Sequence, residues 1–302
     1  MYDVIIIGSG VAGLSAAIYA GSRSLKTAIF EKKENVGGVI YGVSNVTHFP
    51  GLNYNERGDE FVEKIKEQVE DAGAEIIYEE VSKVELDSNP KVVYTNRGKY
   101  EAKRIIIANG TTPRRLDCHT DENDKFISYD AFADSSKAFG KKVFIVGGSD
   151  GALKESIFLS SLANKVHLTH QGDKLTAIEN FQKEATEKSN IEIHLNTRID
   201  SISGESDHLS VKLRDVNTGD IEEFTGDHFV YAYIGGVPNS DLFEGLELSE
   251  SGHIVVDNNM KTNIDGVYAA GDIIDNDIRQ ISTSASEGTI AAIRIADELM
   301  DA

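Results

Sequence analysis

A glycine-rich segment near the start of the chain has the spacing that dinucleotide binding requires. The segment Gly8-Ser9-Gly10-Val11-Ala12-Gly13 follows the β-branched run YDVIII and precedes a helical apolar period. In this pattern the first glycine allows a tight turn, the second lets the backbone approach a pyrophosphate, and the third lets helix and strand pack closely. Glu31 ends the next predicted strand, residues 26–31, where a carboxylate can hold a ribose hydroxyl. The segment therefore predicts a nucleotide-binding βαβ unit.

A second segment repeats the arrangement. Gly147-Gly148-Ser149-Asp150-Gly151-Ala152 follows the run KVFIV and precedes another helical apolar period. One strand–glycine turn–helix pattern is a weak signal, but two in one chain predict two nucleotide-binding lobes.

Composition and charge exclude several classes of partner. The 302 residues include 30 Lys and Arg against 50 Asp and Glu, a formal net charge of −20. Most of such a surface repels nucleic acid and anionic lipid. No run approaches the ~18 apolar residues of a membrane span, and no signal-peptide pattern opens the chain. We expect a soluble cytoplasmic protein with no nucleic-acid or membrane partner and no metal site. With a single cysteine, Cys118, the chain has no intramolecular disulfide.

The remaining periodicity predicts an α/β protein with two nucleotide-binding lobes. Helices are expected over residues 58–73 and 284–300. Strands and hairpins are expected over residues 75–87, 91–95, 100–108, 165–170, 191–200, 208–214, 221–225, 228–234 and 266–270, with a turn at Asn217-Thr218-Gly219. The domain junctions fall near residues 110–116 and 240–248.

Further motifs follow in a characteristic order: Gly37-Gly38, His48-Phe49-Pro50-Gly51, Asn109-Gly110, Gly235-Gly236-Val237-Pro238-Asn239, Gly271-Asp272 and Arg279-Gln280. In order and spacing the whole chain resembles the low-molecular-weight thioredoxin reductases, within the FAD- and pyridine-nucleotide-dependent disulfide reductase superfamily. The resemblance implies an α/β fold with two Rossmann-like (three-layer ββα) nucleotide-binding domains, the second inserted in the first. These would be a discontinuous FAD domain, residues 1–112 plus 247–302, and an NAD(P)-binding-like domain, residues 113–246. It also implies a homodimer.

By the same resemblance, FAD occupies the first domain. The implied contacts are Gly8, Gly10, Ala12, Gly13, Glu31, Gly37, Gly38, Val39, His48, Asn109, Gly110, Gly271, Asp272, Arg279, Gln280 and Ile281. Among them, Asp272 is expected to bind a ribityl hydroxyl, and residues 279–281 to line the pyrimidine edge of the flavin. A turn residue after a strand is the other interpretation of Asp272.

The second glycine loop departs from the family pattern. Ser149 stands where the family has glycine, and His170-Gln171-Gly172 stands where the family has His-Arg-Arg. Because arginine grips the 2′-phosphate of NADPH, its loss predicts NADH rather than NADPH. The NAD contacts are expected from Gly147, Gly148, Ser149, Asp150, Gly151, Ala152 and His170. An empty or repurposed nucleotide site is the alternative.

The family's Cys-x-x-Cys pair is replaced in this chain. Asp130 and Ala133 stand at the two cysteine positions, after Ser128-Tyr129. Disulfide exchange needs an attacking thiolate and a resolving thiol, and neither residue supplies one. Asp130 is interpreted either as a proton donor to a reduced flavin or as the N-cap of a helix that starts at Ala131. Cys118 is interpreted as a buried or incidental thiol.

These features predict an FAD oxidoreductase that passes electrons between NADH, or a small redox protein such as ferredoxin or flavodoxin, and a non-disulfide acceptor. An NADH oxidase or a quinone or flavin reductase is one alternative, and a non-catalytic FAD-binding sensor or interaction protein is another. An acidic partner such as ferredoxin would need local cations, for which the candidates are Arg97, Lys99, Lys103, Arg104, Arg114, Arg115, Lys141 and Lys142.

Overall fold

Two α/β units make up the chain in the computed structural model, which describes residues 1–52, 56–120, 124–205 and 208–300. The first unit combines Met1–Thr112 with Val237–Ala302, and the second is Pro113–Gly236. The second unit is therefore inserted into the first.

A mixed sheet forms the centre of the first unit, in the order β3-β2-β1-β6-β5-β4, with β18 also paired to β6. Its strands are β1 (Tyr2–Ile7), β2 (Thr27–Phe30), β3 (Glu75–Ile77), β4 (Val81–Glu85), β5 (Lys91–Thr95), β6 (Lys99–Ile107) and β18 (Val267–Ala269). Residues 4–7 of β1, all of β2 and residues 105–107 of β6 are buried on both faces, which explains why these stretches are continuous apolar runs rather than alternating ones.

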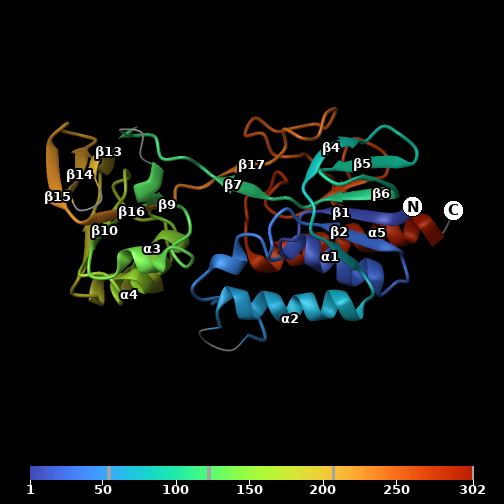
Figure 1. Cartoon of the computed structure of the whole chain (residues 1–302), viewed down its shortest axis with the longest axis horizontal. Helices are drawn as coiled ribbons and strands as arrows, with labels where there is room; N and C mark the ends of the chain where they lie inside the picture. The colour runs from blue at the N-terminus through green and yellow to red at the C-terminus, as the bar shows by residue number, and fades with distance from the viewer. Residues whose placement is uncertain (53–55, 121–123, 206–207, 301–302) are drawn as a thin grey trace. The chain divides into compact units, whose positions relative to one another are not determined.

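Helices α1 (Val11–Gly21), α2 (Gly58–Asp71) and α5 (Ile281–Met300) lie on one side of this sheet (Figure 1). Their apolar side chains pack with those of one face of the sheet, whereas the residues of the other face pack with Phe243, Ile254 and Ile273. Helices α1 and α5 approach closely because Gly288 faces the carbonyl oxygen of Ala12, where a side chain would collide with the backbone.

The second unit places a parallel sheet between two helices and a second sheet. The parallel sheet has the order β12-β11-β10-β16-β9. Its strands are β9 (Ile127–Ser128), β10 (Lys142–Val146), β11 (Lys165–Thr169), β12 (Ile191–His194) and β16 (His228–Ala232). One face packs against α3 (Asp150–Ser160) and α4 (Glu179–Glu187).

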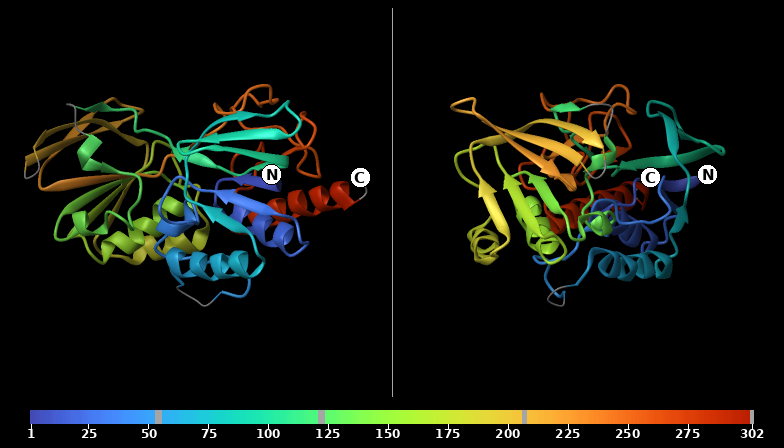
Figure 2. Two further views of the ribbon diagram at one scale, coloured as in Figure 1. Left: turned by 45° about the vertical axis from the view of Figure 1, so that its right-hand side comes forward. Right: turned by 60° about the vertical axis from the view of Figure 1, so that its left-hand side comes forward.

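The other face of the parallel sheet packs against a four-stranded sheet of order β15-β14-β13-β8, drawn in yellow to orange in Figure 2 apart from β8. Its strands are β8 (His119–Thr120), β13 (Thr197–Glu205), β14 (His208–Asp215) and β15 (Ile221–Gly226). The turn predicted at Asn217-Thr218-Gly219 joins β14 to β15, and Asp215 accepts hydrogen bonds from the backbone N–H groups of Asn217 and Thr218.

Strands β7 (Thr111–Pro113) and β17 (Gly236–Pro238) pair where the chain passes between the units. The first passage coincides with the predicted junction after residue 112, but the second lies at Val237 rather than at residue 247. Residues 237–246 belong to the first unit because β17 pairs at the junction and Phe243 is buried in the core of that unit.

Several predicted elements differ from the observed ones. The predicted strand over 75–87 is two strands, of which β3 is parallel to β2 and β4 antiparallel to β5. The predicted helix over 284–300 begins earlier, at Ile281. No α-helix starts at Ala131, because residues 131–134 form a turn that runs into the short 3-10 helix Ser135–Ala138. None of the described helices has the length and apolar character needed to cross a membrane.

Candidate functional site

The first glycine loop joins β1 to α1, and two of its glycines are required by the protein's own packing. Gly8 has φ +100°, and a Cβ there would lie 2.5 Å from the carbonyl oxygen of Ala108. A Cβ on Gly13 would collide with the carbonyl oxygen of Gly8. Both glycines therefore allow the strand–helix approach itself.

Gly10 is different, because nothing in the protein requires a glycine there. Its backbone is extended, with φ −65° and ψ 177°, and its nearest neighbour to an added Cβ is the Ala108 oxygen at 3.9 Å. Gly10 is also the N-cap of α1, whose first turn has neither a side-chain cap nor an acidic residue. The open space and the uncapped N–H groups together fit a pyrophosphate at this position.

Glu31, the residue after β2, binds the glycine loop through its carboxylate. Its Oε2 accepts hydrogen bonds from the Ser9 hydroxyl (2.5 Å) and the Ser9 backbone N–H (3.2 Å), and its Oε1 accepts one from the Lys33 N–H (2.9 Å). Residues 37–38 also lie beside the glycine loop, because the Gly37 N–H donates a hydrogen bond to the Ser9 carbonyl at 2.7 Å. A Cβ on Gly38 would lie 3.2 Å from the Gly10 Cα. Glu31, Gly37 and Gly38 thus gather around the glycine loop.

Asp272 follows β18 and lies among ionisable side chains. Burial raises the pKa of the Asp272 carboxyl above its ordinary value, although the Arg279 and His253 charges act in the opposite direction. Gly271 beside it packs against Ala12, and its N–H donates to the Glu287 carboxylate at 2.8 Å. Burial likewise raises the pKa of Glu287. The carboxyl end of β18 therefore meets the start of α1 and the first turns of α5.

A hydrogen bond to His253 fixes the position of the Arg279 side chain. The Arg279 Nη2 lies 3.0 Å from the His253 Nε2. Because a guanidinium only donates, this Nε2 accepts, and the imidazole proton resides on Nδ1, which donates to the Ser251 hydroxyl at 2.8 Å. Burial and the Arg279 charge lower the pKa of His253, in agreement with a neutral ring.

Asn109 and Asn239 tie together two segments of the first unit. The Asn109 Nδ2 donates to the Asn239 carbonyl at 2.9 Å, and the Asn239 Nδ2 donates to the Asn109 carbonyl at 2.8 Å. Gly110 accepts from the Asn239 N–H. The Asn109 Oδ1 is buried and accepts no hydrogen bond within the described part of the chain. A buried acceptor of this kind fits a ligand that donates a hydrogen bond.

The other expected FAD contacts lie nearer the surface. Val39 is 64% exposed, and His48, Arg279 and Gln280 are exposed. Ile281 begins α5 and packs against the core on the helix side of the sheet.

The second glycine loop joins β10 to α3 and is fixed by the segment after β11. The Gly148 carbonyl accepts the Thr176 and Ala177 N–H groups at 2.8 and 2.9 Å, and Asp150 Oδ1 accepts the Ile178 N–H at 2.8 Å. The His170 imidazole fills the space beside Gly148, where a Cβ would lie 2.6 Å from its Nδ1.

The remaining residues of that loop lie in two environments. Ser149 and Gly151 are exposed, whereas Gly147 and Ala152 are buried at the turn into α3. The structure thus brings the expected residues 147–152 and His170 together at the carboxyl end of a parallel sheet.

The segment around Asp130, where the sequence resemblance predicts the dithiol position, is a hydrogen-bonded turn. The Asp130 Oδ1 accepts the Ala133 N–H at 2.9 Å, and Tyr233 accepts the Ala131 N–H at 2.9 Å. Asp130 therefore caps a turn rather than the expected helix. Cys118 is partly buried and packs against the core between the two sheets of the second unit.

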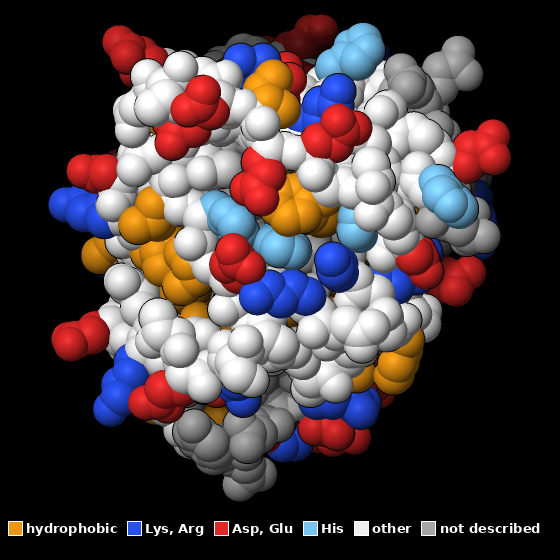
Figure 3. Space-filling view, turned by 90° about the vertical axis from the view of Figure 1, so that its left-hand side faces the viewer, with side chains coloured by type: hydrophobic (Ala, Val, Ile, Leu, Met, Phe, Trp, Pro, Cys, Tyr) orange, Lys and Arg blue, Asp and Glu red, His pale blue; other side chains and the backbone are white. Residues whose placement is uncertain are grey.

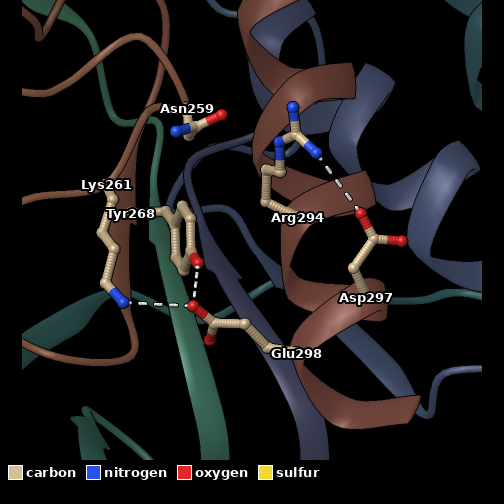
Figure 4. A pocket seen from close by; sticks show the side chains of 6 residues that line it. All are labelled: Asn259, Lys261, Tyr268, Arg294, Asp297 and Glu298. Carbon is tan, nitrogen blue, oxygen red and sulfur yellow. Dashed lines mark hydrogen bonds and ion pairs between the residues drawn. The ribbon is translucent and has the colours of Figure 1, made fainter. Parts of the chain in front are cut away.

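Another hollow lies in the first unit, apart from the glycine loop. It measures about 430 Å³ and is lined by Asn259, Lys261, Tyr268, Arg294, Asp297 and Glu298 (Figure 4). Glu298 accepts hydrogen bonds from Lys261 and Tyr268, and Arg294 pairs with Asp297. None of the expected FAD or NAD contacts lines this hollow, and its charges are already paired with one another.

Four residues that hold the first site together were not among the expected contacts, although two of them, Ser9 and Asn239, lie within motifs recognised in the sequence. They are Ser9, Asn239, His253 and Glu287. Glu287 could have been found from the sequence, because it is a carboxylate among the small and apolar residues Gly288, Ala291 and Ala292 of α5. His253 could not, because its partner Arg279 is 26 residues away in the chain.

Two glycine loops, each at the carboxyl end of a strand with parallel neighbours (β1 and β10), define the class of dinucleotide-binding α/β oxidoreductases. A family model described as pyridine nucleotide-disulphide oxidoreductase matches residues 2–288. The thioredoxin reductase of Peptoclostridium acidaminophilum is 35% identical over 300 residues, covering 97% of this chain and 95% of the relative.

Two further comparisons agree. A 34.2 kDa protein in the rubredoxin operon of Clostridium pasteurianum is 36% identical over 295 residues, covering 96% of this chain and 95% of that protein. The crystal structure of Lactococcus lactis thioredoxin reductase in its FR conformation matches with a TM-score of 0.94 at 30% identity, covering 100% of both chains. The chain belongs to the pyridine nucleotide-disulphide oxidoreductase family and is thioredoxin reductase-like within it. Enzymes of this kind use FAD and NAD(P)H, and this chain is an FAD-dependent oxidoreductase.

Proposed function

We propose that this oxidoreductase works without a redox-active disulfide, passing electrons between NADH, or a small redox protein such as ferredoxin or flavodoxin, and a non-disulfide acceptor. The replacement of the cysteine pair carries the proposal. Asp130 and Ala133 stand at its positions, and Cys118 is the single cysteine of the chain. One thiol cannot form the internal disulfide that relays electrons to a substrate disulfide.

The first unit supplies the proposed flavin site. Gly10 and the N-terminus of α1 would lie against the pyrophosphate, and Glu31 would hold a ribose hydroxyl through lone pairs that Ser9 and Lys33 leave available. Asp272 would bind a ribityl hydroxyl, and Arg279, held by His253, would approach the pyrimidine edge. When bound, FAD supplies hydride acceptance and single-electron release. The protein's part is to position the cofactor and to exclude competing reactions.

The second unit supplies the proposed nicotinamide-nucleotide site, with NADH preferred. Within residues 170–172 the chain offers one imidazole and no guanidinium, and that imidazole packs against Gly148. A 2′-phosphate would therefore lack its bidentate partner. The uncapped N-terminus of α3 still offers N–H groups to a pyrophosphate.

Asp130 supports the turn in this proposal rather than the chemistry. Its Oδ1 already accepts the Ala133 N–H, as expected for a residue kept for local structure. The neighbouring Asp134 also has local hydrogen-bond partners. Burial alone would raise the pKa of its carboxyl, but hydrogen bonds from Ser128 and Lys137 lower this pKa below its ordinary value.

Charge disfavours an acidic protein partner over NADH as the electron donor. Of the cations considered for docking, Lys99, Lys103, Arg104 and Lys141 form ion pairs with Glu101, Asp3, Glu298 and Asp227. In a chain with a net charge of −20, these pairs leave less positive field for an acidic surface. The relative described from a rubredoxin operon supports keeping a small redox protein among the candidates. We also propose a homodimer, by analogy with the family.

Anaerobic mixing of the FAD-loaded protein with NADH and with NADPH tests this function. Loss of the oxidised flavin absorbance, faster with NADH, is the expected result. The reduced protein is then offered a quinone, a redox dye, a ferredoxin and thioredoxin disulfide. At least one of the first three should be reduced, whereas thioredoxin disulfide should remain oxidised.

A non-catalytic FAD protein is the second candidate, favoured by the changes at Ser149 and residues 170–172. Flavin that neither nucleotide nor a reduced redox protein bleaches would support it and contradict the proposed activity.

A further inference from the structure

A group of metal-ligand side chains lies in the second unit, outside the residues assigned to either nucleotide site. His167, Glu192 and His194 each offer one ligand atom, and these atoms all lie within 4.8 Å of one another. The two imidazoles are closest, with the His167 Nδ1 3.0 Å from the His194 Nε2. The Glu192 Oε1 lies 3.8 Å from the same His194 nitrogen.

Strand alternation explains why these side chains meet. In the parallel pair β11 and β12, His167 is the register partner of Glu192, and His194 follows Glu192 by two residues. Their neighbours Val166, Leu168, Ile191 and Ile193 pack toward α3 and α4, so the three ligand side chains share the opposite face.

Aromatic packing fixes the position of the His167 ring. The ring stacks on Phe144, with centroids 4.9 Å apart and an interplanar angle of 14°, and the Phe224 ring lies 4.8 Å away. His167 is 4% exposed, whereas β12 is the edge strand of its sheet. The side chains of His194 and Glu192 are 15% and 49% exposed. A buried, preorganised ligand thus lies behind two ligands that an ion from solvent can reach.

The charges around the cluster are mixed. The Glu192 Oε2 pairs with the Lys165 ammonium at 2.9 Å, while its Oε1 is directed toward His194. Glu222 of β15 also lies close enough to act electrostatically on His194. Histidine side chains gather on the face drawn in Figure 3, with acidic and basic side chains beside them. Lys165 is therefore the cation that an incoming metal ion would compete with at Glu192.

We propose that His167, Glu192 and His194 bind a divalent transition-metal ion, with Zn²⁺ the best match, across strands β11 and β12. Two imidazole nitrogens and a carboxylate oxygen suit zinc, and three protein ligands leave the fourth tetrahedral position to water. Zinc–ligand bonds of about 2.0–2.1 Å place tetrahedral ligand atoms roughly 3.3 Å apart. The observed 3.0 and 3.8 Å separations, and a separation of at most 4.8 Å between the His167 and Glu192 ligand atoms, require side-chain rotations to reach this value. The bound ion would cross-link the edge strand to the sheet and so stabilise the folded second unit.

Zinc titration of the FAD-loaded, chelator-treated protein tests this site, by calorimetry or by competition with a chromophoric chelator. We expect one saturable site per chain. His194→Ala should weaken zinc binding by more than about tenfold, the loss that even supporting residues of metal sites cause. His208→Ala, which removes an exposed histidine of β14, is the matched control and should leave zinc binding unchanged.

A second variant tests the site without removing a ligand. Lys165→Gln removes the cation that holds Glu192, so zinc should bind more tightly, by up to about fivefold, the value of an exposed ion pair. Absence of saturable zinc binding would show that the two imidazoles form a hydrogen bond only. That result, binding unaffected by His194→Ala, or weaker binding by Lys165→Gln would each overturn the proposal.

Discussion

The two glycines at positions 10 and 13 should respond to the same substitution in opposite ways. At Gly10 the backbone is extended, and a new Cβ would meet nothing of the protein closer than 3.9 Å. Gly10→Ala should therefore change the stability of the FAD-free chain by less than ~1 kcal/mol, because the less flexible unfolded chain offsets the poorer N-cap preference of alanine. At Gly13 the Cβ would collide with the Gly8 carbonyl oxygen, so Gly13→Ala should destabilise the fold itself by about 1–3 kcal/mol.

FAD affinity should separate the two variants further. The methyl group of Gly10→Ala would occupy the space assigned to the pyrophosphate, and overpacking of about 1–3 kcal/mol corresponds to roughly 5- to 150-fold weaker binding. Thermal unfolding of the FAD-free proteins measures the first effect, and quenching of flavin fluorescence on titration measures the second. FAD binding by Gly10→Ala at wild-type affinity would refute the reasoning. So would destabilisation of its FAD-free form as large as that of Gly13→Ala.

Four other variants follow from the sites. Asp272→Asn should weaken FAD binding by roughly 10- to 100-fold, since hydrogen bonds to charged groups contribute about 1.5–3 kcal/mol. Because burial raises the pKa of Asp272, the folded FAD-free chain retains a proton that the unfolded chain releases, and wild-type stability falls as pH rises between the two pKa values. The stability advantage of Asp272→Asn should therefore grow over that window in thermal unfolding, and an advantage that shrinks would contradict the burial argument. Gln171→Arg, at an exposed position, should raise the rate of flavin reduction by NADPH relative to NADH in stopped-flow mixing; an unchanged ratio would place the 2′-phosphate elsewhere. Asp130→Cys combined with Ala133→Cys should create an oxidisable dithiol detectable by thiol titration, whereas Cys118→Ser should leave dye reduction unchanged; dye reduction lost in Cys118→Ser would make that thiol catalytic.

Local patterns predicted the parts of the fold that local physics determines. The apolar runs of β1, β10 and β16 and the glycine turns after β1 and β10 appear where the sequence predicts them, because strands buried on both faces leave a continuous signal. The residues at which strands begin and end were less predictable. The break between β12 and β13 falls near Asn196, whose φ of +51° ends the strand without a glycine to mark it.

Contacts between distant segments could not be predicted from one sequence. Position 130 was expected to precede a helix. Only the structure shows a turn held by Asp130 and by the Tyr233 hydroxyl, which accepts the Ala131 N–H across 102 positions of the chain. The His167–Glu192–His194 cluster depends on the register of two parallel strands, and register leaves no spacing motif. The Arg279–His253 contact likewise joins segments that no periodicity connects.

The number of electrons that the protein accepts per FAD tests the absence of a redox-active disulfide most directly. Anaerobic reductive titration, followed by flavin absorbance and by thiol counting, separates a flavin that acts alone from a flavin coupled to a disulfide. The FAD-loaded chain should be fully reduced by one two-electron equivalent per flavin, with no new thiol appearing. Uptake of a second two-electron equivalent per flavin, accompanied by newly titratable thiol, would contradict the proposed function.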